Sequence, residues 1–153
     1  MQTREEALEA RGYSIDDVPK PNDVFAAVVE HGGVAYLSGI VPISGGHVVS
    51  RGKVPSAVPL DDAIEAAELC AANLLRVFAR DIGPLSRIRR VIKVTGYVNC
   101  DPDFTEAHQV IHGASRLLVD VLGEAGRHAR AALGMAGLPL GASVEVEMLV
   151  AVE

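Results

Sequence analysis

The last segment of the chain, Val144 to Val152, constrains the fold more than any other. Valine or methionine occupies every second position, and the residues between them include two glutamates. Successive side chains of a β-strand point to opposite faces, so this pattern predicts a strand with one wholly apolar face and with Glu145 and Glu147 on the other. The chain must therefore build a sheet that packs one face against a core.

Other segments provide the partners of this strand. Thr3 and Glu6 have the spacing of a capping box and predict a short helix over residues 4–11, followed by a proline-containing connector. Apolar residues recur at helical spacing in two segments, 61–82 and 111–122. Strand-forming residues gather in four segments, 24–30, 34–38, 48–49 and 88–98. The predicted order is β-β-α-β-α-β, and the length suits a single domain over residues 1–153, with the helix and connector in residues 1–20.

A turn around Pro139 and Leu140 precedes the last strand. If this turn closes a hairpin, Glu147 lies opposite Ala132, and Arg130 is its diagonal neighbour. A cation and a carboxylate would then share one surface. This arrangement is either a surface ion pair or a site for a small organic acid, which an arginine binds through two parallel hydrogen bonds.

One face of the predicted sheet lacks cover, because two helices can cover only one face of a sheet of this size. Small residues on the other face permit close approach, and a symmetric homo-oligomer is the common way to bury such a surface. We therefore expect this face to meet other copies of the chain. The residues placed on it are Thr95, Ala132, Gly134 and Ala136.

The net charge of −6 over 153 residues makes nucleic acid a disfavoured partner, because the overall field repels a phosphate backbone. No apolar run approaches the ~20 residues that span a bilayer, and the first residues do not resemble a signal peptide. We expect no membrane partner and a cytoplasmic location.

His108 and His112 are four residues apart and could hold zinc together with a third ligand if they share a helix face. Helix caps and solvated helix faces explain them equally well. Neither an HExxH pattern nor paired CxxC motifs support a metal, and no glycine-rich motif offers a cradle for a nucleotide. We expect neither a metal nor a cofactor.

Three C-terminal segments together resemble the Rid family (RidA/YjgF), the reactive-intermediate imine deaminases formerly called L-PSP endoribonucleases. They are Arg-Ala-Ala-Leu-Gly at 130–134, Leu-Pro-Leu-Gly at 138–141 and Val-Glu-Val-Glu at 144–147, with support from residues 34–39, 91–98 and 123–130. The match runs from about Pro21 to the end. It implies a chorismate-mutase-like α+β fold of the bacillus type, β-β-α-β-α-β, with helices packed on one face of a mixed sheet. It also implies a homotrimer with three clefts between subunits.

The resemblance also implies roles for individual residues. In active members, an arginine at the position of Arg130 holds the substrate carboxylate, and a glutamate at the position of Glu145 helps to place the attacking water. Near Arg130 this glutamate should remain ionised, which suits it to orienting water. An aromatic residue from the neighbouring subunit contributes to the cleft, and Phe25 stands about there without the usual hydroxyl group. Ser38 and Gly39 match a Ser-Gly pair that lines the cleft.

Two positions depart from the better-known deaminases: His112 stands in place of an asparagine, and Ala132 in place of a cysteine. These departures indicate a divergent subgroup. The implied reaction is hydrolysis of a 2-imino acid, the tautomer of an enamine such as 2-aminoacrylate, to a 2-keto acid and ammonia, without a cofactor. The alternative is a non-catalytic binding or regulatory module for small carboxylates in the same cleft. Ribonuclease activity conflicts with the acidic charge and with the lack of a clear catalytic histidine pair.

Overall fold

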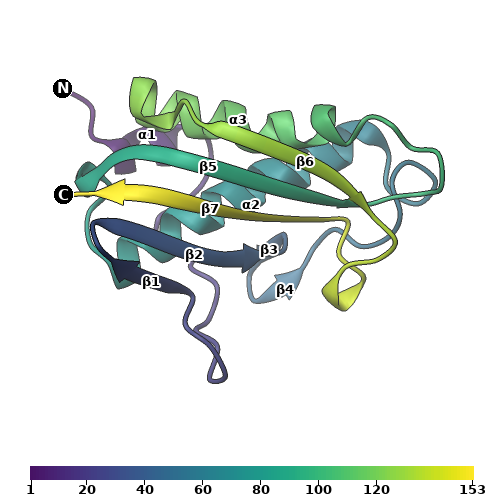
Figure 1. Cartoon of the computed structure of the whole chain (residues 1–153), viewed down its shortest axis with the longest axis horizontal. Coiled ribbons are helices and arrows are strands. Elements are labelled where there is room, and N and C mark those ends of the chain that lie inside the picture. The colour runs from purple at the N-terminus through teal and green to yellow at the C-terminus, as the bar shows by residue number, and fades with distance from the viewer.

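The computed structural model describes all 153 residues and consists of a five-stranded mixed sheet with two long helices on one face (Figure 1). The helices are α1 (Arg4–Ala10), α2 (Leu60–Asp81) and α3 (Ala107–Leu122). The strands are β1 (Val28–His31), β2 (Val34–Ile40), β3 (Ile43–Ser44), β4 (His47–Val48), β5 (Ile88–Asn99), β6 (Ala129–Met135) and β7 (Val144–Val152). The main sheet has the order β1-β2-β7-β5-β6, whereas β3 and β4 form a separate small hairpin. None of the helices is both long and apolar enough to span a lipid bilayer.

The predicted elements are largely confirmed, with α2, β5 and β7 close to their expected bounds. The second long helix begins at Ala107, four residues earlier than the sequence predicted. Ala107 and Val110 are buried and extend the apolar face that continues through Ile111 and Ala114. The polar residues between them obscured this start in the sequence. As a result, His108 and His112 both lie on α3.

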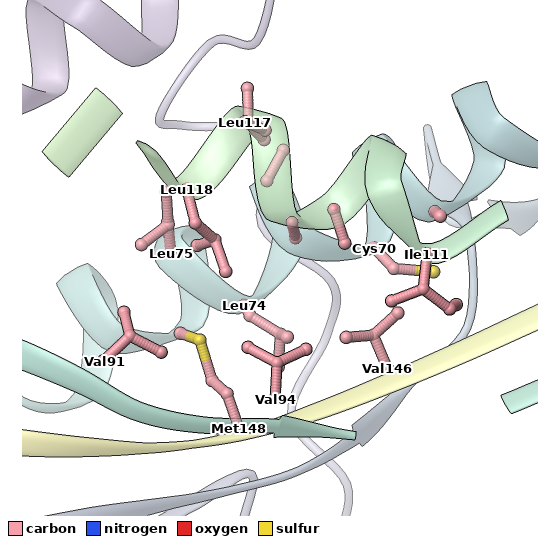
Figure 2. Close-up of a cluster of buried hydrophobic side chains, with 14 of the residues drawn as sticks. Cys70, Leu74, Leu75, Val91, Val94, Ile111, Leu117, Leu118, Val146 and Met148 are labelled. Carbon is pink, nitrogen blue, oxygen red and sulfur yellow. The ribbon is translucent and has the colours of Figure 1, made fainter. Parts of the chain in front are cut away.

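The core lies between the sheet and the two long helices, and Figure 2 shows its centre. Each layer contributes apolar side chains that are almost fully removed from water. They include Cys70, Leu74 and Leu75 of α2, Ile111, Leu117 and Leu118 of α3, Val91 and Val94 of β5, and Val146 and Met148 of β7. Full burial of a single Val, Leu, Ile or Met side chain stabilises a fold by about 1.5–3 kcal/mol, so this layer carries the packing.

The N-terminal helix packs beside the ends of these elements. The capping box of Thr3 and Glu6 is confirmed, and Leu8 is fully buried. Arg4 donates hydrogen bonds to the carbonyl oxygens of Leu85 and Ile88, at 2.9 and 2.7 Å. The partner of this helix, which the sequence did not reveal, is therefore the start of β5 together with α3.

The predicted hairpin around Pro139 and Leu140 is wrong, because β5 lies between β6 and β7. A strand that follows a crossover helix returns parallel to the strand it left, so β6 pairs in parallel with the outer edge of β5. The connecting residues 136–143 then pass the end of β5, and β7 enters the sheet on its other side, antiparallel to β5 and β2. Turn residues alone could not distinguish this passage from a tight hairpin.

The uncovered sheet face is confirmed, but only Thr95 of its four predicted members lies on it. Ala132 and Gly134 pair with Gly96 and Val98 of β5, and they share the side that faces the helices. Ala136 lies beyond the end of β6, whereas Thr95 pairs with Glu147 on the open face. The error follows from the hairpin, which assigned the wrong side of the sheet to alternate residues of β6. Large apolar side chains on the open face are Val29, Tyr36 and Leu133, which are 53%, 48% and 44% exposed.

Candidate functional site

Arg130 reaches from the edge strand β6 towards α3. Its register partner Val94 faces the core, which places Arg130 on the helix side of the sheet. One terminal nitrogen, Nη1, donates to His112 Nδ1 at 2.9 Å and to Ser115 Oγ at 3.3 Å. The other, Nη2, donates to the backbone carbonyl of His108 at 3.3 Å. Helix α3 thus holds the guanidinium in one orientation.

Two histidines beside this guanidinium, His112 and His128, have lowered pKa values, which favours their neutral forms. Burial, followed by the charge of Arg130, lowers the pKa of His112, so its Nδ1 can accept a hydrogen bond. Burial also lowers the pKa of His128. Its Nδ1 lies 2.6 Å from the Gly126 carbonyl, which can only accept, so Nδ1 carries the proton and Nε2 accepts from Ser115 Oγ at 2.9 Å. Ser115 can then offer a lone pair to Arg130.

No carboxylate compensates the charge of Arg130, because none of the ion pairs in the chain includes it. The residue is partly buried, and burial lowers its pKa. An arginine nevertheless remains charged at physiological pH. A partly desolvated guanidinium with only neutral partners can bind a carboxylate through charge-assisted hydrogen bonds.

A second cluster surrounds Glu145 of β7. A Cβ atom at Gly39 would lie 2.8 Å from Glu145 Oε2, so the absence of a side chain there makes room for the carboxylate. Ser38 Oγ donates to the Ala26 carbonyl at 2.7 Å and holds the segment before β1. Phe25, Ser38 and Gly39 line one small pocket of about 130 Å³.

Glu145 does not lie near Arg130 of its own chain, where it was expected to remain ionised. Burial, with the charge of Glu147 as a second cause, raises the pKa of Glu145. Glu147 itself accepts a hydrogen bond of 2.5 Å from the hydroxyl of Tyr97, and this bond is the main reason that the pKa of Tyr97 rises to about 12. Within one chain, Glu145 therefore takes up a proton more readily than an ordinary glutamate.

The two clusters do not meet within one chain. Arg130 is in register with Val94 of β5, whereas Glu145 is in register with Tyr97 on the other side of β5. Their side chains also point to opposite faces of the sheet. Three residues along a strand correspond to roughly 10 Å, and a whole strand lies between them. A small ligand cannot touch both residues of the same chain.

The predicted site residues thus fall into two groups. His112 joins Arg130, and Ala132 follows on the same side of β6, where it packs against the core and offers no polar side-chain atom. Gly39 lies against Glu145, and Phe25 and Ser38 line a pocket together with Gly39.

The sequence did not single out Ser115 and His128, which complete the Arg130 group. A signal for both was nevertheless present. Ser115 follows His112 by three residues, which is one helical turn, and His128 precedes Arg130 by two, the period of an extended chain.

Residues 6–152 match the family model described as "YjgF/chorismate_mutase-like, putative endoribonuclease". Protein TCP17 of Trypanosoma cruzi is 35% identical over 144 residues, which cover 94% of this chain and 90% of that protein. The crystal structure of Atu1372 from Agrobacterium tumefaciens, a protein of unknown function, has a TM-score of 0.91 with 43% identity and covers 98% of this chain and 92% of that chain. A Shewanella oneidensis MR-1 structure described as a "putative endoribonuclease" has a TM-score of 0.93 with 25% identity. The match covers 99% of this chain and 100% of that chain.

These similarities extend over nearly the whole chain and agree with the observed order of helices and strands. The expected α+β fold, with a mixed sheet and helices packed on it, is therefore confirmed. The chain belongs to the YjgF/chorismate mutase-like family.

Proposed function

We propose that the protein hydrolyses small 2-imino acids, the tautomers of enamines such as 2-aminoacrylate, to 2-keto acids and ammonia. The observation that carries this proposal is Arg130: a partly buried guanidinium with three neutral hydrogen-bond partners and no carboxylate. It suits a receptor for the carboxylate that every 2-imino acid carries. Some members of the family have this deaminase activity.

The proposed site is complete only between two copies of the chain. Arg130 and Glu145 of one chain are separated by β5 and by the thickness of the sheet. The open sheet face exposes Tyr36 and Leu133, and Arg130 stands on the edge strand β6. The proposed contact therefore joins the β6 edge of one copy, with its Arg130 group, to the open face of the next copy, with its Glu145 group. A homotrimer gives three equivalent clefts of this kind, because a head-to-tail contact closes into a ring.

Each group has a defined role in the reaction. Arg130 holds the substrate carboxylate and fixes the position of the adjacent C=N carbon. Glu145 of the neighbouring copy orients a water molecule and accepts one of its protons as the oxygen bonds to that carbon and the C=N π bond opens, and it passes this proton to the nitrogen. The C–N bond of the resulting carbinolamine then breaks as the hydroxyl proton moves through the Glu145 carboxylate to the leaving nitrogen, so that the products are the C=O group of the keto acid and ammonia. Positioning of this kind supplies up to about 7–11 kcal/mol in favourable cases.

The test uses 2-iminopropionate generated in situ, with pyruvate formation followed against the spontaneous rate. We expect the wild-type protein to accelerate hydrolysis and Arg130→Ala to return it to background, because the carboxylate loses charge-assisted bonds worth about 1.5–3 kcal/mol each. Arg89→Ala is the matched control, since Arg89 lies on a distant, exposed part of β5. Equal acceleration by wild type and Arg130→Ala would contradict the proposal.

The same variants address the non-catalytic alternative, which the missing Phe25 hydroxyl and the apolar Ala132 favour. Calorimetric titration with 2-ketobutyrate measures binding without turnover. Binding that Arg130→Ala abolishes, together with no acceleration by the wild type, would establish a carboxylate-binding module instead of an enzyme.

A further inference from the structure

A pocket of about 450 Å³ adjoins Arg130 in the groove between α3 and the start of β6. Its lining residues are Ser115, Arg116, Val119, Asp120, Arg127, His128 and Arg130. Four of these residues lie on one face of α3, because positions i, i+1, i+4 and i+5 of a helix point to the same side. They are Ser115, Arg116, Val119 and Asp120. The pocket therefore continues from the proposed carboxylate receptor towards the C-terminal end of α3.

This pocket carries an excess of positive charge that nothing in the chain neutralises. None of the ion pairs includes Arg116, Arg127 or Arg130. Asp120 is the only acidic residue in the lining, and its carboxylate is ion-paired with Arg11 of the N-terminal segment. Three guanidiniums thus gather at one pocket in a protein whose net charge is −6.

The uncharged residues of the pocket do not offset these cations. Ser115 gives its proton to His128, and His128 gives its Nδ1 proton to a backbone carbonyl, so both side chains are neutral. Arg116 stands one turn beyond His112 and is among the charges that lower the pKa of that histidine, after burial and Arg130. The field of Arg116 therefore reaches the group around Arg130.

We propose that the substrate carries a second anionic group, a carboxylate or a phosphate monoester, which Arg116 and Arg127 bind while Arg130 holds the α-carboxylate. This inference rests on the proposed function and names its substrate class: dicarboxylic or phosphorylated 2-imino acids. Arginine suits both groups, because its planar fork matches the oxygens of carboxylates and phosphates. Carboxylate and phosphate differ in charge and oxygen number, so binding experiments can separate them.

The experiment compares three keto acids by calorimetric titration: 2-ketobutyrate with one acid group, 2-ketoglutarate with two, and 3-phosphohydroxypyruvate with a phosphate. We expect wild type to bind one of the two ligands that carry a second acid group about 10- to 100-fold more tightly than 2-ketobutyrate, as one further charge-assisted pair would give. The double variant Arg116→Met/Arg127→Met should lose this preference and keep its affinity for 2-ketobutyrate. Arg51→Met/Arg89→Met is the matched control, because it removes the same charge from exposed positions outside this pocket.

Equal wild-type affinity for all three ligands would overturn the inference and leave the proposed function intact. A preference for a ligand with a second acid group that survives in the double variant would also overturn it, because the second anion would then bind elsewhere. A separate titration with inorganic phosphate covers the case in which no keto acid binds. If wild type binds phosphate but no keto acid, and the double variant Arg116→Met/Arg127→Met loses this binding while the control variant keeps it, the anion pocket is supported and the proposed function fails. No binding of phosphate or of any keto acid would overturn both.

Discussion

Arg130 and Glu145 are both partly removed from water, with opposite consequences for their charge. Burial lowers the pKa of Arg130, but an arginine starts so far above physiological pH that it stays a cation. Burial and the neighbouring Glu147 raise the pKa of Glu145, so its ionised form is less favoured than in water. The receptor for the acid is therefore permanently charged, and the proposed water-orienting group is sensitive to pH.

The first prediction concerns this sensitivity. If ionised Glu145 orients the water, activity falls as the pH drops through its raised pKa. Glu147→Gln removes the negative neighbour that is the second cause of the shift, so the pKa of Glu145 falls. We expect the acidic limb of the pH–rate profile for kcat/KM to move to lower pH. Glu124→Gln, at an exposed position away from β7, is the control and should leave the limb in place. If the acidic limb of the profile does not move in Glu147→Gln either, Glu145 is not the group whose titration the limb reports.

At the scale of elements, the two long helices approach each other closely at Gly113 of α3. A Cβ atom there would overlap the backbone carbonyl oxygen of Ile64 in α2, and a backbone atom cannot turn aside as a flexible side chain can. The glycine therefore sets the separation of α2 and α3. That separation in turn places the face of α3 that holds Arg130.

We predict that Gly113→Ala destabilises the protein. Overpacking costs ~1–3 kcal/mol, and the higher helix propensity of alanine offsets about 1 kcal/mol of it. Because the clash is with backbone, we expect a net loss of roughly 2 kcal/mol in the free energy of unfolding. Urea denaturation at fixed protein concentration measures this loss. Gly137→Ala is the matched control, because no atom lies within 4 Å of the added Cβ and stability should change little. If the free energy of unfolding of Gly113→Ala equals that of the wild type, α2 and α3 can move apart at no cost, and Gly113 does not set their separation.

At the scale of the whole molecule, the proposed site depends on assembly. The Arg130 group lies on the helix side of β6, and the Glu145 group lies beside Gly39 on the open side of β7. The open face also exposes Tyr36 and Leu133, which a monomer would leave in water. Both features favour an oligomer in which each copy supplies half of every site.

Mixing two inactive variants tests this arrangement. Arg130→Ala and Glu145→Gln are each expected to abolish imine hydrolysis. Co-expression of the two should restore activity, because about one quarter of head-to-tail interfaces in a random assembly pair an intact arginine with an intact glutamate. A mass measurement on the mixture confirms that the oligomers form. Activity that stays at background in mixed oligomers would contradict a site shared between copies.

The sequence by itself determined the elements and the chemistry they could carry. Alternation in residues 144–152, helical spacing in 61–82 and the capping box at Thr3 each depend on neighbours within a few positions, and each is confirmed. The resemblance to known deaminases supplied Arg130 and Glu145 as candidates, since a residue type at a matching position is a property of the chain alone.

Only the tertiary structure decided which candidates meet. Strand pairing is a long-range choice: whether β7 pairs with β6 or inserts on the other side of β5 depends on the crossover through α3 and on the partners available in the sheet. That choice put Arg130 and Glu145 on opposite sides of the sheet and placed Ser115 and His128 beside the arginine. Local pattern cannot specify it, because the same alternation fits either edge of a neighbouring strand.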